Sequence, residues 1–496
     1  MWLVAGLGTL ALALLWHAPT IDDAYISFRY ARNLVEHGEL VFNPGEKVEG
    51  TTNLLWTLAC APAVLLGVPM ETWALGGALV CLAWAAARLA LVGRAMGASP
   101  VAALVAVGLC ATNLHFLRAT TNGLEGALYA ALTVETLLRV LRGELRAAGL
   151  FAGLLFCTRP EGVAMAGLAG LLAWRLHGRG RALLAGGAIV GALVLAVTLW
   201  RLFTYGDPVP NSVIAKSLGF AELRVARFGL PYFLGWAWES LPLVLLLGLA
   251  AALLLRQWHS REPATAAALF AALALATSYV VTLRNAGDWM PHYRLLAQYL
   301  PLYAVLALWL ASPRGRAHLG RPGLMAPAAA LALLFQSQQL VLGFGQDDEE
   351  TNRAFYRESA RRLEGRLGPE DVVSAEGLGL IAWTLYEVRF HDPLGLTDRH
   401  LARHGTPEPM FGKEDVNYTV GTVRPAVLLW HWAGHLRPLR PELAAGYEIR
   451  CYSQCDRAWD ARVVMLRSDR AAALRPEFLD WPAVALGPGG PAIAPP

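Results

Sequence analysis

The chain has 496 residues, a length that would fit roughly two to four soluble domains. Hydrophobic residues make up 55% of it and charged residues only 16%, whereas soluble globular proteins carry about 25% charged residues. This composition excludes a soluble enzyme, a disordered chain and a fibrous repeat and indicates a multi-pass membrane protein. A net charge of +4 is too small to indicate nucleic acid as a partner.

Apolar stretches that approach the roughly 20 residues needed to cross a bilayer recur over the first 343 residues. The first stretch has no basic leader and a poor cleavage site, which favours an uncleaved helix over a signal peptide. Residues 53–69 are also apolar. We predict a polytopic α-helical protein with about 11 transmembrane helices, at 1–18, 73–92, 101–118, 123–141, 147–158, 163–175, 183–203, 241–255, 264–283, 293–311 and 323–343.

Arginines between the predicted spans indicate the side that each loop faces, because basic residues concentrate in cytoplasmic loops. Placing the arginine clusters inside puts 19–52, 119–122, 158–162, 204–240, 284–292 and the chain after 343 outside. It also makes 53–69 an interfacial or re-entrant element. We therefore expect a multi-pass protein of the inner (plasma) membrane, with its active site facing the periplasm or the exterior. The clusters are Arg88/Arg94, Arg139/Arg142/Arg146, Arg175/Arg179/Arg181, Arg256/Arg261 and Arg314/Arg316/Arg321.

Two adjacent carboxylates, Asp22 and Asp23, stand directly outside the first predicted helix. Apolar residues at 21, 25 and 28 recur at helical spacing and predict a helix along the membrane surface. In one interpretation the acids only complement the N-terminus of that helix. In the other, a carboxylate takes a proton from a hydroxyl nucleophile, and Arg29 holds a phosphate. Those are the two needs of a transferase with a lipid-phosphate donor.

Further polar residues of the outer loops are candidates for binding a sugar or a phosphate. Glu49 and Asn53 lie in a loop too rich in Asn, Gly, Glu and Trp to be a spacer. Glu125 either complements a helix N-terminus or faces the sugar. Arg159 either pairs with a neighbouring acid or approaches the donor phosphate. Lys216 is either a solvated loop lysine or a point charge that binds phosphate.

One short outer loop combines Asp288, Trp289, His292 and Arg294. Arg294 begins an apolar helix, where an unpaired charge is costly, so its partner is either an acid or a lipid phosphate. Trp289 either stacks on a sugar or anchors the chain at the membrane interface. We expect His292 and Arg294 to contact the donor phosphate, and Asp288 and Trp289 to contact the sugar or the acceptor.

The chain after the last predicted span differs in character. Short runs of β-type residues at 371–373, 426–429 and 462–466 predict a small mixed α/β extracytoplasmic domain over 344–486. The transmembrane catalytic domain would then cover 1–343. The Gly/Pro-rich tail, 487–496, is expected to be disordered.

The predicted C-terminal domain carries three local motifs. Gly377-x-Gly379 follows a predicted strand but lacks the third glycine of a nucleotide site, so no such site is expected. Asp392 and Asp398 belong to a polar cluster that indicates a lid or an acceptor contact. Cys451 and Cys455 make a poor zinc site, and an outside location favours a disulfide.

Six segments carry a resemblance to a known family. They are, in order, DDAYISFRYARNLVEHGELVFNPGEKVEGTTNLLW, TTNGLEGALYAAL, TRPEG, YGDPVPNSVIAKS, GDWMPHYRLLAQYLPL and HDPLGLTDRHLARHG. The first of them resembles the opening signature of the membrane arabinofuranosyltransferases of the GT-C class. In particular, the chain resembles terminal β-(1→2)-arabinofuranosyltransferases with a decaprenyl-phosphate arabinofuranose donor, over about residues 20–405.

The resemblance implies many membrane helices, an outer-face active site, and an aspartate of the first outer loop as general base. We favour Asp22 as the base and Asp23 as its support or as a metal ligand. No cofactor is required, although a divalent cation remains an option. The expected partners are a polyprenyl-phosphate sugar donor, a glycan or glycoprotein acceptor and the lipid bilayer.

The expected function is therefore that of an inverting glycosyltransferase of the cell envelope, with arabinofuranose as the favoured sugar. The alternative is another GT-C transferase that moves a hexose or aminosugar to lipopolysaccharide, pilin or protein. A lipid-linked sugar transporter fits less well, because transporters tend to place charges at the bilayer midplane and to contain repeats.

Overall fold

The computed structural model describes residues 2–217, 229–317, 335, 347–408, 411–456, 460–487 and 490–493. The chain divides into two units. The helical unit comprises Met1–Ile21, Thr52–Phe203 and Leu218–Gly345. The sheet unit comprises Asp22–Thr51, Thr204–Ser217 and Gln346–Pro496, so two segments expected in loops of the membrane part group with the C-terminal part.

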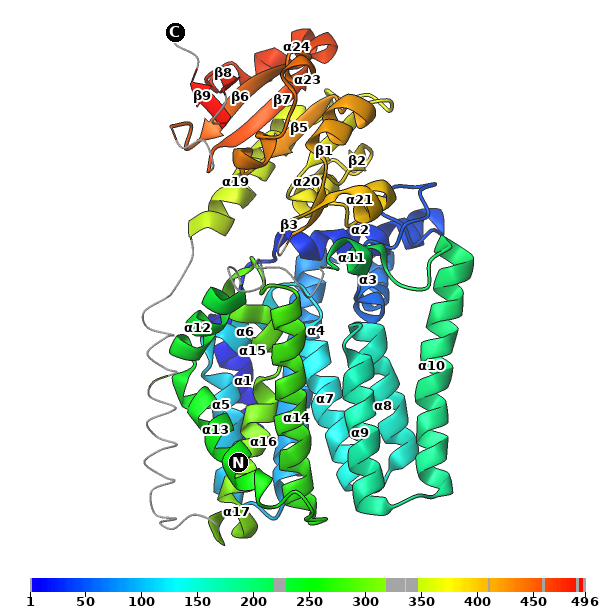
Figure 1. The fold of residues 1–496 in the computed structure, drawn as a ribbon, viewed down its shortest axis with the longest axis vertical. Helices are drawn as coiled ribbons and strands as arrows, with labels where there is room; N and C mark the ends of the chain where they lie inside the picture. Colours follow the sequence, from blue (N-terminus) through cyan, green and yellow to red (C-terminus); the bar gives the residue numbers. More distant parts are fainter. Residues whose placement is uncertain are drawn as a thin grey trace. The chain divides into compact units, whose positions relative to one another are not determined.

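Helices account for the regular structure of the helical unit, and α7, α8 and α9 lie side by side within it (Figure 1). The described helices are α1 (Trp2–Leu15), α3 (Leu54–Leu66), α4 (Met70–Ala95), α5 (Pro100–Ala111), α6 (Leu114–Thr121), α7 (Gly126–Leu141), α8 (Leu145–Thr158), α9 (Gly162–His177), α10 (Arg181–Tyr205), α12 (Leu230–Glu239), α13 (Leu241–Leu255), α14 (Pro263–Arg284), η2 (Pro291–Tyr293), α15 (Arg294–Ala297), α16 (Leu300–Ala311) and α17 (Pro313–Ala317).

Three of the described helices, α4, α10 and α14, are long and apolar enough to cross a membrane. The number rises to six if each bent pair is one span: α5–α6 bent by 65°, α12–α13 by 96°, and 291–297 with α16 by 56°. The predicted count of about 11 spans is therefore not confirmed. Helix α8 is apolar but short and ends before Arg159-Pro160, because the residue that precedes a proline disfavours the helical conformation. The predicted span 323–343 lies outside the described residues, apart from residue 335.

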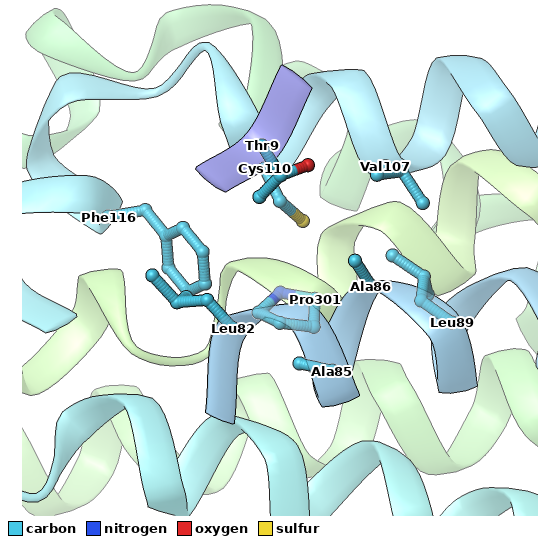
Figure 2. Close-up of a pocket in the computed structure, with 9 residues that line it drawn as sticks. All are labelled: Thr9, Leu82, Ala85, Ala86, Leu89, Val107, Cys110, Phe116 and Pro301. Carbon is cyan, nitrogen blue, oxygen red and sulfur yellow. The ribbon is translucent and has the colours of Figure 1, made fainter. Parts of the chain in front are cut away.

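Small residues allow close helix packing in the helical unit. A Cβ atom on Gly149 of α8 would lie 2.3 Å from the carbonyl oxygen of Gly186 in α10, so these two backbones touch. Figure 2 shows a small apolar pocket where α1, α4, α5, α6 and α16 meet, lined by side chains that include Phe116 and the thiol of Cys110. Cys110, like Cys60, Cys81 and Cys157, is free and buried.

A five-stranded mixed sheet forms the core of the sheet unit, with strand order β2-β1-β5-β7-β6 (Figure 1). Strands β2, β1 and β5 run parallel, and β7 runs antiparallel to both β5 and β6. The strands are β1 (Val372–Ala375), β2 (Arg389–His391), β3 (Thr406–Glu408), β4 (Gly412–Glu414), β5 (Val427–Trp430), β6 (Tyr447–Ser453), β7 (Arg462–Arg467), β8 (Val484–Gly487) and β9 (Gly490–Ile493).

Three strands of this sheet coincide with predicted β-type runs, because β1, β5 and β7 lie over 371–373, 426–429 and 462–466. Gly490–Ile493, within the tail expected to be disordered, pairs with β8 as β9. The helices of the unit are α2 (Asp22–His37), α11 (Asn211–Ala215), α19 (Asp347–Leu363), α20 (Leu378–Thr384), α21 (Arg399–His404), α22 (Val416–Tyr418), η4 (Thr419–Val423), η5 (Ala433–Leu436), α23 (Pro441–Ala444), α24 (Ser468–Leu474) and η6 (Arg475–Phe478).

Helix α2 is the helix predicted in the first outer loop, and it packs on α20. Its aromatic residues Tyr25 and Phe28 meet Trp383 of α20, with ring centroids 6.5 and 6.2 Å apart. The apolar positions that suggested a membrane-surface helix therefore pack against protein. The polar face is split, because Arg32 and Glu36 form an exposed ion pair whereas Arg29 is buried.

Candidate functional site

Asp22 is the first residue of α2, and its carboxylate is held by the beginning of α20. The N–H of Gly379 donates to Oδ2 at 2.9 Å, and the N–H of Leu380 donates to Oδ1 at 2.8 Å. Each carboxylate oxygen retains a further lone pair that can accept a proton. The two amides thus orient the carboxylate without using all of its acceptor capacity.

The environment of Asp22 makes its carboxyl group more basic than an ordinary aspartate. Burial raises the pKa of Asp22 to about 6, and the repulsion of Asp23 adds to the rise. The amides of Leu380 and Gly379 and the charge of Arg353 oppose it. A pKa near 6 leaves Asp22 mostly ionised at neutral pH and close to the range that suits a general base. Asp23 follows it in α2 and is partly exposed.

The Gly377-x-Gly379 motif explains why α2 and α20 can approach so closely. A Cβ atom on Gly379 would lie 1.8 Å from the carbonyl oxygen of Asp22. A Cβ atom on Gly377 would lie 2.2 Å from the ring of Tyr356, whose hydroxyl accepts the Gly377 N–H at 2.6 Å. These two glycines therefore allow α20 to pack closely against Asp22 and Tyr356.

Arg29, expected to bind phosphate, has its guanidinium enclosed by backbone carbonyls. Nε donates to Phe42 O at 2.8 Å, Nη2 donates to Val388 O at 3.0 Å, and Nη1 donates to Ala382 O. Burial lowers the pKa of Arg29 to about 10. These contacts join the loop after α2 to the segment between α20 and β2. They give Arg29 a structural role, and its expected phosphate contact stays a prediction.

In the helical unit, the structure brings together three of the predicted site residues: Asn53, Glu125 and Arg159. Glu125 Oε2 accepts the Asn53 amide at 2.8 Å, and Oε1 accepts Arg159 Nη1 at 2.6 Å. Arg159 Nε also donates to Glu161 at 2.5 Å. Arg159 therefore has two acid partners. Glu125 makes no capping hydrogen bond to the amides of α7, so its contacts differ from the simple N-terminal role.

The loop with Asp288 and Arg294 is tightly built. Arg294 Nε donates to Asp288 Oδ2 at 2.5 Å, which identifies an acid as one partner of this arginine. His292 and Tyr293 both have positive φ angles, 66° and 48°, as does Ala286 at 58°. Non-glycine residues rarely adopt this conformation, and such strain concentrates at functional sites. Trp289 is partly exposed.

A further arginine, Arg118, escaped the sequence analysis. It lies in α6, is 8% exposed, and its Nη1 is 3.3 Å from His292 Nε2. Its Nε has no hydrogen-bond partner, and among the described residues no acid lies within ion-pair distance. A buried cation without an acid is costly unless an anion binds. Its position at the end of the predicted span 101–118 was the available signal.

The other predicted residues belong to the sheet unit. Glu49 is buried, and its backbone carbonyl accepts the N–H of Asn211. Asp392 accepts the amides of Leu394 and Thr397, whereas Asp398 caps α21 by accepting the Leu401 amide. Lys216 ends α11, is partly exposed, and forms no ion pair with the described residues.

The predicted disulfide and the candidate metal site both belong to the sheet unit. Cys451 and Cys455 form a disulfide. Within the described ranges, no three His, Cys, Asp or Glu side chains are grouped to hold a metal ion. The metal-ligand option for Asp22 and Asp23 stays a prediction.

Comparison with characterised proteins gives relatives in sequence, although no family model matches. The chain is 30% identical over 334 residues to a terminal β-(1→2)-arabinofuranosyltransferase of Corynebacterium glutamicum, covering 58% of this chain and 46% of that protein. It is 31% identical over 263 residues to the protein of the same name from Mycobacterium tuberculosis, covering 46% of this chain and 40% of that protein. The chain thus spans less than half the length of the curated relatives it matches. The resemblance found in the sequence is confirmed.

Comparison with solved structures gives the fold. Two crystal structures of ArnT from Cupriavidus metallidurans match over 94% of this chain. The apo structure has a TM-score of 0.54 at 15% identity and is covered over 96% of its length. The structure bound to undecaprenyl phosphate has a TM-score of 0.53 at 16% identity and is covered over 97%. The chain has the GT-C fold. This part of the sequence prediction is confirmed.

Proposed function

We propose that the chain is an inverting membrane glycosyltransferase that moves a sugar, with arabinofuranose favoured, from a polyprenyl-phosphate donor to a cell-envelope glycan or glycoprotein. The relatives named arabinofuranosyltransferases support the choice of sugar. The ArnT structure bound to undecaprenyl phosphate supports a lipid-phosphate carrier. The observation that carries the chemistry is the Asp22 carboxylate, held by two amides, with its pKa raised to about 6.

In the proposed reaction, Asp22 accepts the proton of an acceptor hydroxyl. The oxygen attacks the anomeric carbon of the donor sugar, and the bond between that carbon and the phosphate oxygen breaks. Polyprenyl phosphate leaves with the bonding electron pair, so atoms and charge balance without a nucleotide or a redox cofactor. A single displacement inverts the anomeric centre.

The leaving phosphate gains negative charge in the transition state and needs a cationic partner. Arg159 and Arg294 already pair with acids, whereas Arg118 is buried without an acid among the described residues. We therefore assign the main phosphate contact to Arg118, with His292 beside it. Arg294 and Arg159 would then hold the shape of the outer loops.

A donor panel tests the choice of sugar. The purified full chain is incubated with a neutral arabinan acceptor and with synthetic polyprenyl-phosphate arabinofuranose, a polyprenyl-phosphate hexose or a polyprenyl-phosphate aminosugar. Glycoside formation is measured by mass spectrometry. We expect the arabinofuranose donor to react at least about fivefold faster than the other two, since one well-placed hydroxyl contact is worth about 1 kcal/mol.

The same panel distinguishes the alternative transferase. Preferential use of the hexose or the aminosugar donor would contradict the arabinofuranose assignment and favour another GT-C transferase. Asp469→Asn, which changes an exposed carboxylate of the sheet unit, serves as the control and should leave donor preference unchanged.

A further inference from the structure

A pocket of about 420 Å³ lies against the edge strand β2, entirely within the sheet unit. In the parallel register of β1 and β2, Val372 is opposite Arg389 and Ser374 is opposite His391. Alternate residues of a strand share a face, so these four side chains form one surface of the sheet. The residues that line the pocket include Val372, Arg389, His391, Asp398, Tyr418 and Thr422.

His391 lines this pocket, and one of its two ring nitrogens, Nε2, is buried without a hydrogen bond. Its side chain is only 7% exposed, and its Nδ1 lies 3.0 Å from the hydroxyl of Ser374. Its Nε2 makes no hydrogen bond of good geometry and lies within ion-pair distance of Asp398 Oδ2, at 3.5 Å. Buried polar atoms are almost always hydrogen-bonded, so this atom calls for a ligand that supplies the missing partner.

The charges around the pocket are already balanced by neighbours. Arg389 pairs with Glu46 at 2.5 Å, and Arg399 pairs with Asp207 at 3.0 Å. Each cation therefore already has an acid partner, which weakens its attraction for a further anion. The remaining polar groups are hydroxyls, one imidazole and the Asp398 carboxylate, which together suit a neutral ligand with several hydroxyl groups.

We propose that this pocket binds a neutral glycan, as a subsite for the acceptor chain of the transferase. The role of acceptor rests on the proposed function, whereas glycan binding as such does not. A volume near 420 Å³ falls within the range of about 300–1,000 Å³ typical of small-ligand sites. His391 Nε2 and Asp398 would exchange hydrogen bonds with sugar hydroxyls.

The test measures binding in the absence of donor. Isothermal titration of the full chain with a synthetic neutral arabinofuranosyl oligosaccharide is compared for the native chain and Thr422→Trp. Thr422 is exposed at the pocket, so the larger ring fills the pocket without disturbing the core. We expect affinity to fall at least about tenfold, since loss of a hydrogen bond and steric exclusion act together. Thr406→Trp, at an exposed position of β3 outside the pocket, should bind like the native chain.

A second variant tests the unused imidazole nitrogen. His391→Leu removes the hydrogen-bonding group and should weaken glycan binding by about three- to tenfold. In the transfer assay, Thr422→Trp should raise the acceptor KM by at least about tenfold and leave the slow hydrolysis of donor by water unchanged.

Any of three results would overturn the glycan subsite. The first is that the native chain fails to bind a neutral glycan, the second is that Thr422→Trp binds it as well as the native chain does, and the third is that a phosphorylated oligosaccharide binds more tightly than a neutral one. Glycan binding without any sugar transfer would leave the pocket standing and contradict the proposed function instead.

Discussion

At the scale of the residue, the carboxyl group of Asp22 responds to opposing effects. Burial and the neighbouring Asp23 raise its pKa, and the amides of Gly379 and Leu380 limit that rise. The folded state therefore binds the proton more tightly than the unfolded chain, whose aspartate titrates near 3.8. The contribution of this group to stability is greatest below pH 3.8 and is lost as the pH rises to about 6.

This pKa predicts the acid limb of the activity profile. If Asp22 is the base, kcat/KM should be level above neutral pH and fall about tenfold per pH unit below pH 6, because protonation removes the base. Initial rates of transfer between pH 4.5 and pH 8 give the apparent pKa. An acid limb that persists unchanged in the residual activity of Asp22→Asn would assign that pKa to another group.

Two arginines of the helical unit, Arg294 and Arg118, should respond differently to replacement by glutamine. Arg294→Gln leaves Asp288 without its ion-pair partner and should lower the free energy of unfolding by about 3–5 kcal/mol. Arg118→Gln removes a cation with no acid nearby and should not carry that cost. It should instead weaken the binding of polyprenyl phosphate by at least about tenfold, the loss expected for a charge-assisted hydrogen bond.

Thermal unfolding and lipid-phosphate binding of the two arginine variants check this contrast. A large loss of stability in Arg118→Gln with unchanged binding of polyprenyl phosphate would contradict the phosphate assignment. Arg361→Gln, at an exposed ion pair of α19, is the control for both measurements.

At the scale of the element, the contact of α2 with α20 is the feature on which the Asp22 geometry depends. Gly379→Ala would place a methyl group 1.8 Å from the carbonyl oxygen of Asp22 and must separate the two helices. We expect a loss of about 2 kcal/mol or more in stability, the usual cost of overpacking, together with loss of activity. Unfolding curves and turnover of the variant test this.

A matched substitution separates packing from helix propensity. Gly191→Ala lies in α10, where a Cβ atom meets nothing within 4 Å, and alanine is the better helix former. It should be neutral or slightly stabilising. Native stability in Gly379→Ala would show that the α2–α20 contact is looser than described.

Several elements were predictable from the sequence because their signal is local. Helix α2 follows from apolar spacing, and β1, β5 and β7 follow from short runs of β-type residues. The role of Arg29 was not predictable, because its carbonyl partners Ala382 and Val388 lie more than 350 residues away in sequence. The hydrogen bonds from Gly379 and Leu380 to Asp22 were not predictable for the same reason, although the Gly377-x-Gly379 motif could be recognised in the sequence.

At the scale of the whole molecule, the sequence indicated a membrane protein and a C-terminal α/β segment, but not how its segments group. The segment Asp22–Thr51 belongs to the sheet unit, where Asn43 makes two hydrogen bonds with the backbone of Phe390. The Phe390 N–H donates to Asn43 Oδ1 at 3.1 Å, and Asn43 Nδ2 donates to the Phe390 carbonyl at 2.7 Å. Such contacts join segments without any signal in composition or periodicity. The predicted span count is not confirmed among the described residues, and apolar length alone does not reveal the bends at α5–α6 and α12–α13.

The predicted sidedness can be tested on exposed residues. Lys47→Cys in the first loop should react with a membrane-impermeant maleimide in intact cells. Arg179→Cys, between α9 and α10, should react only after the membrane is permeabilised, because basic loops face the cytoplasm. The reverse labelling pattern would overturn the outer location of the Asp22 loop.

The stoichiometry of the reaction tests directly whether the chain is an inverting glycosyltransferase with Asp22 as its base. The purified full chain is supplied with polyprenyl-phosphate arabinofuranose and a neutral arabinan acceptor, and released polyprenyl phosphate is counted against new glycosidic bonds. We predict one lipid phosphate released per bond, inversion at the anomeric carbon, and at least about a hundredfold slower turnover in Asp22→Asn. Labelled lipid that crosses vesicle leaflets without glycoside formation, or full turnover in both Asp22→Asn and Asp23→Asn, would contradict it.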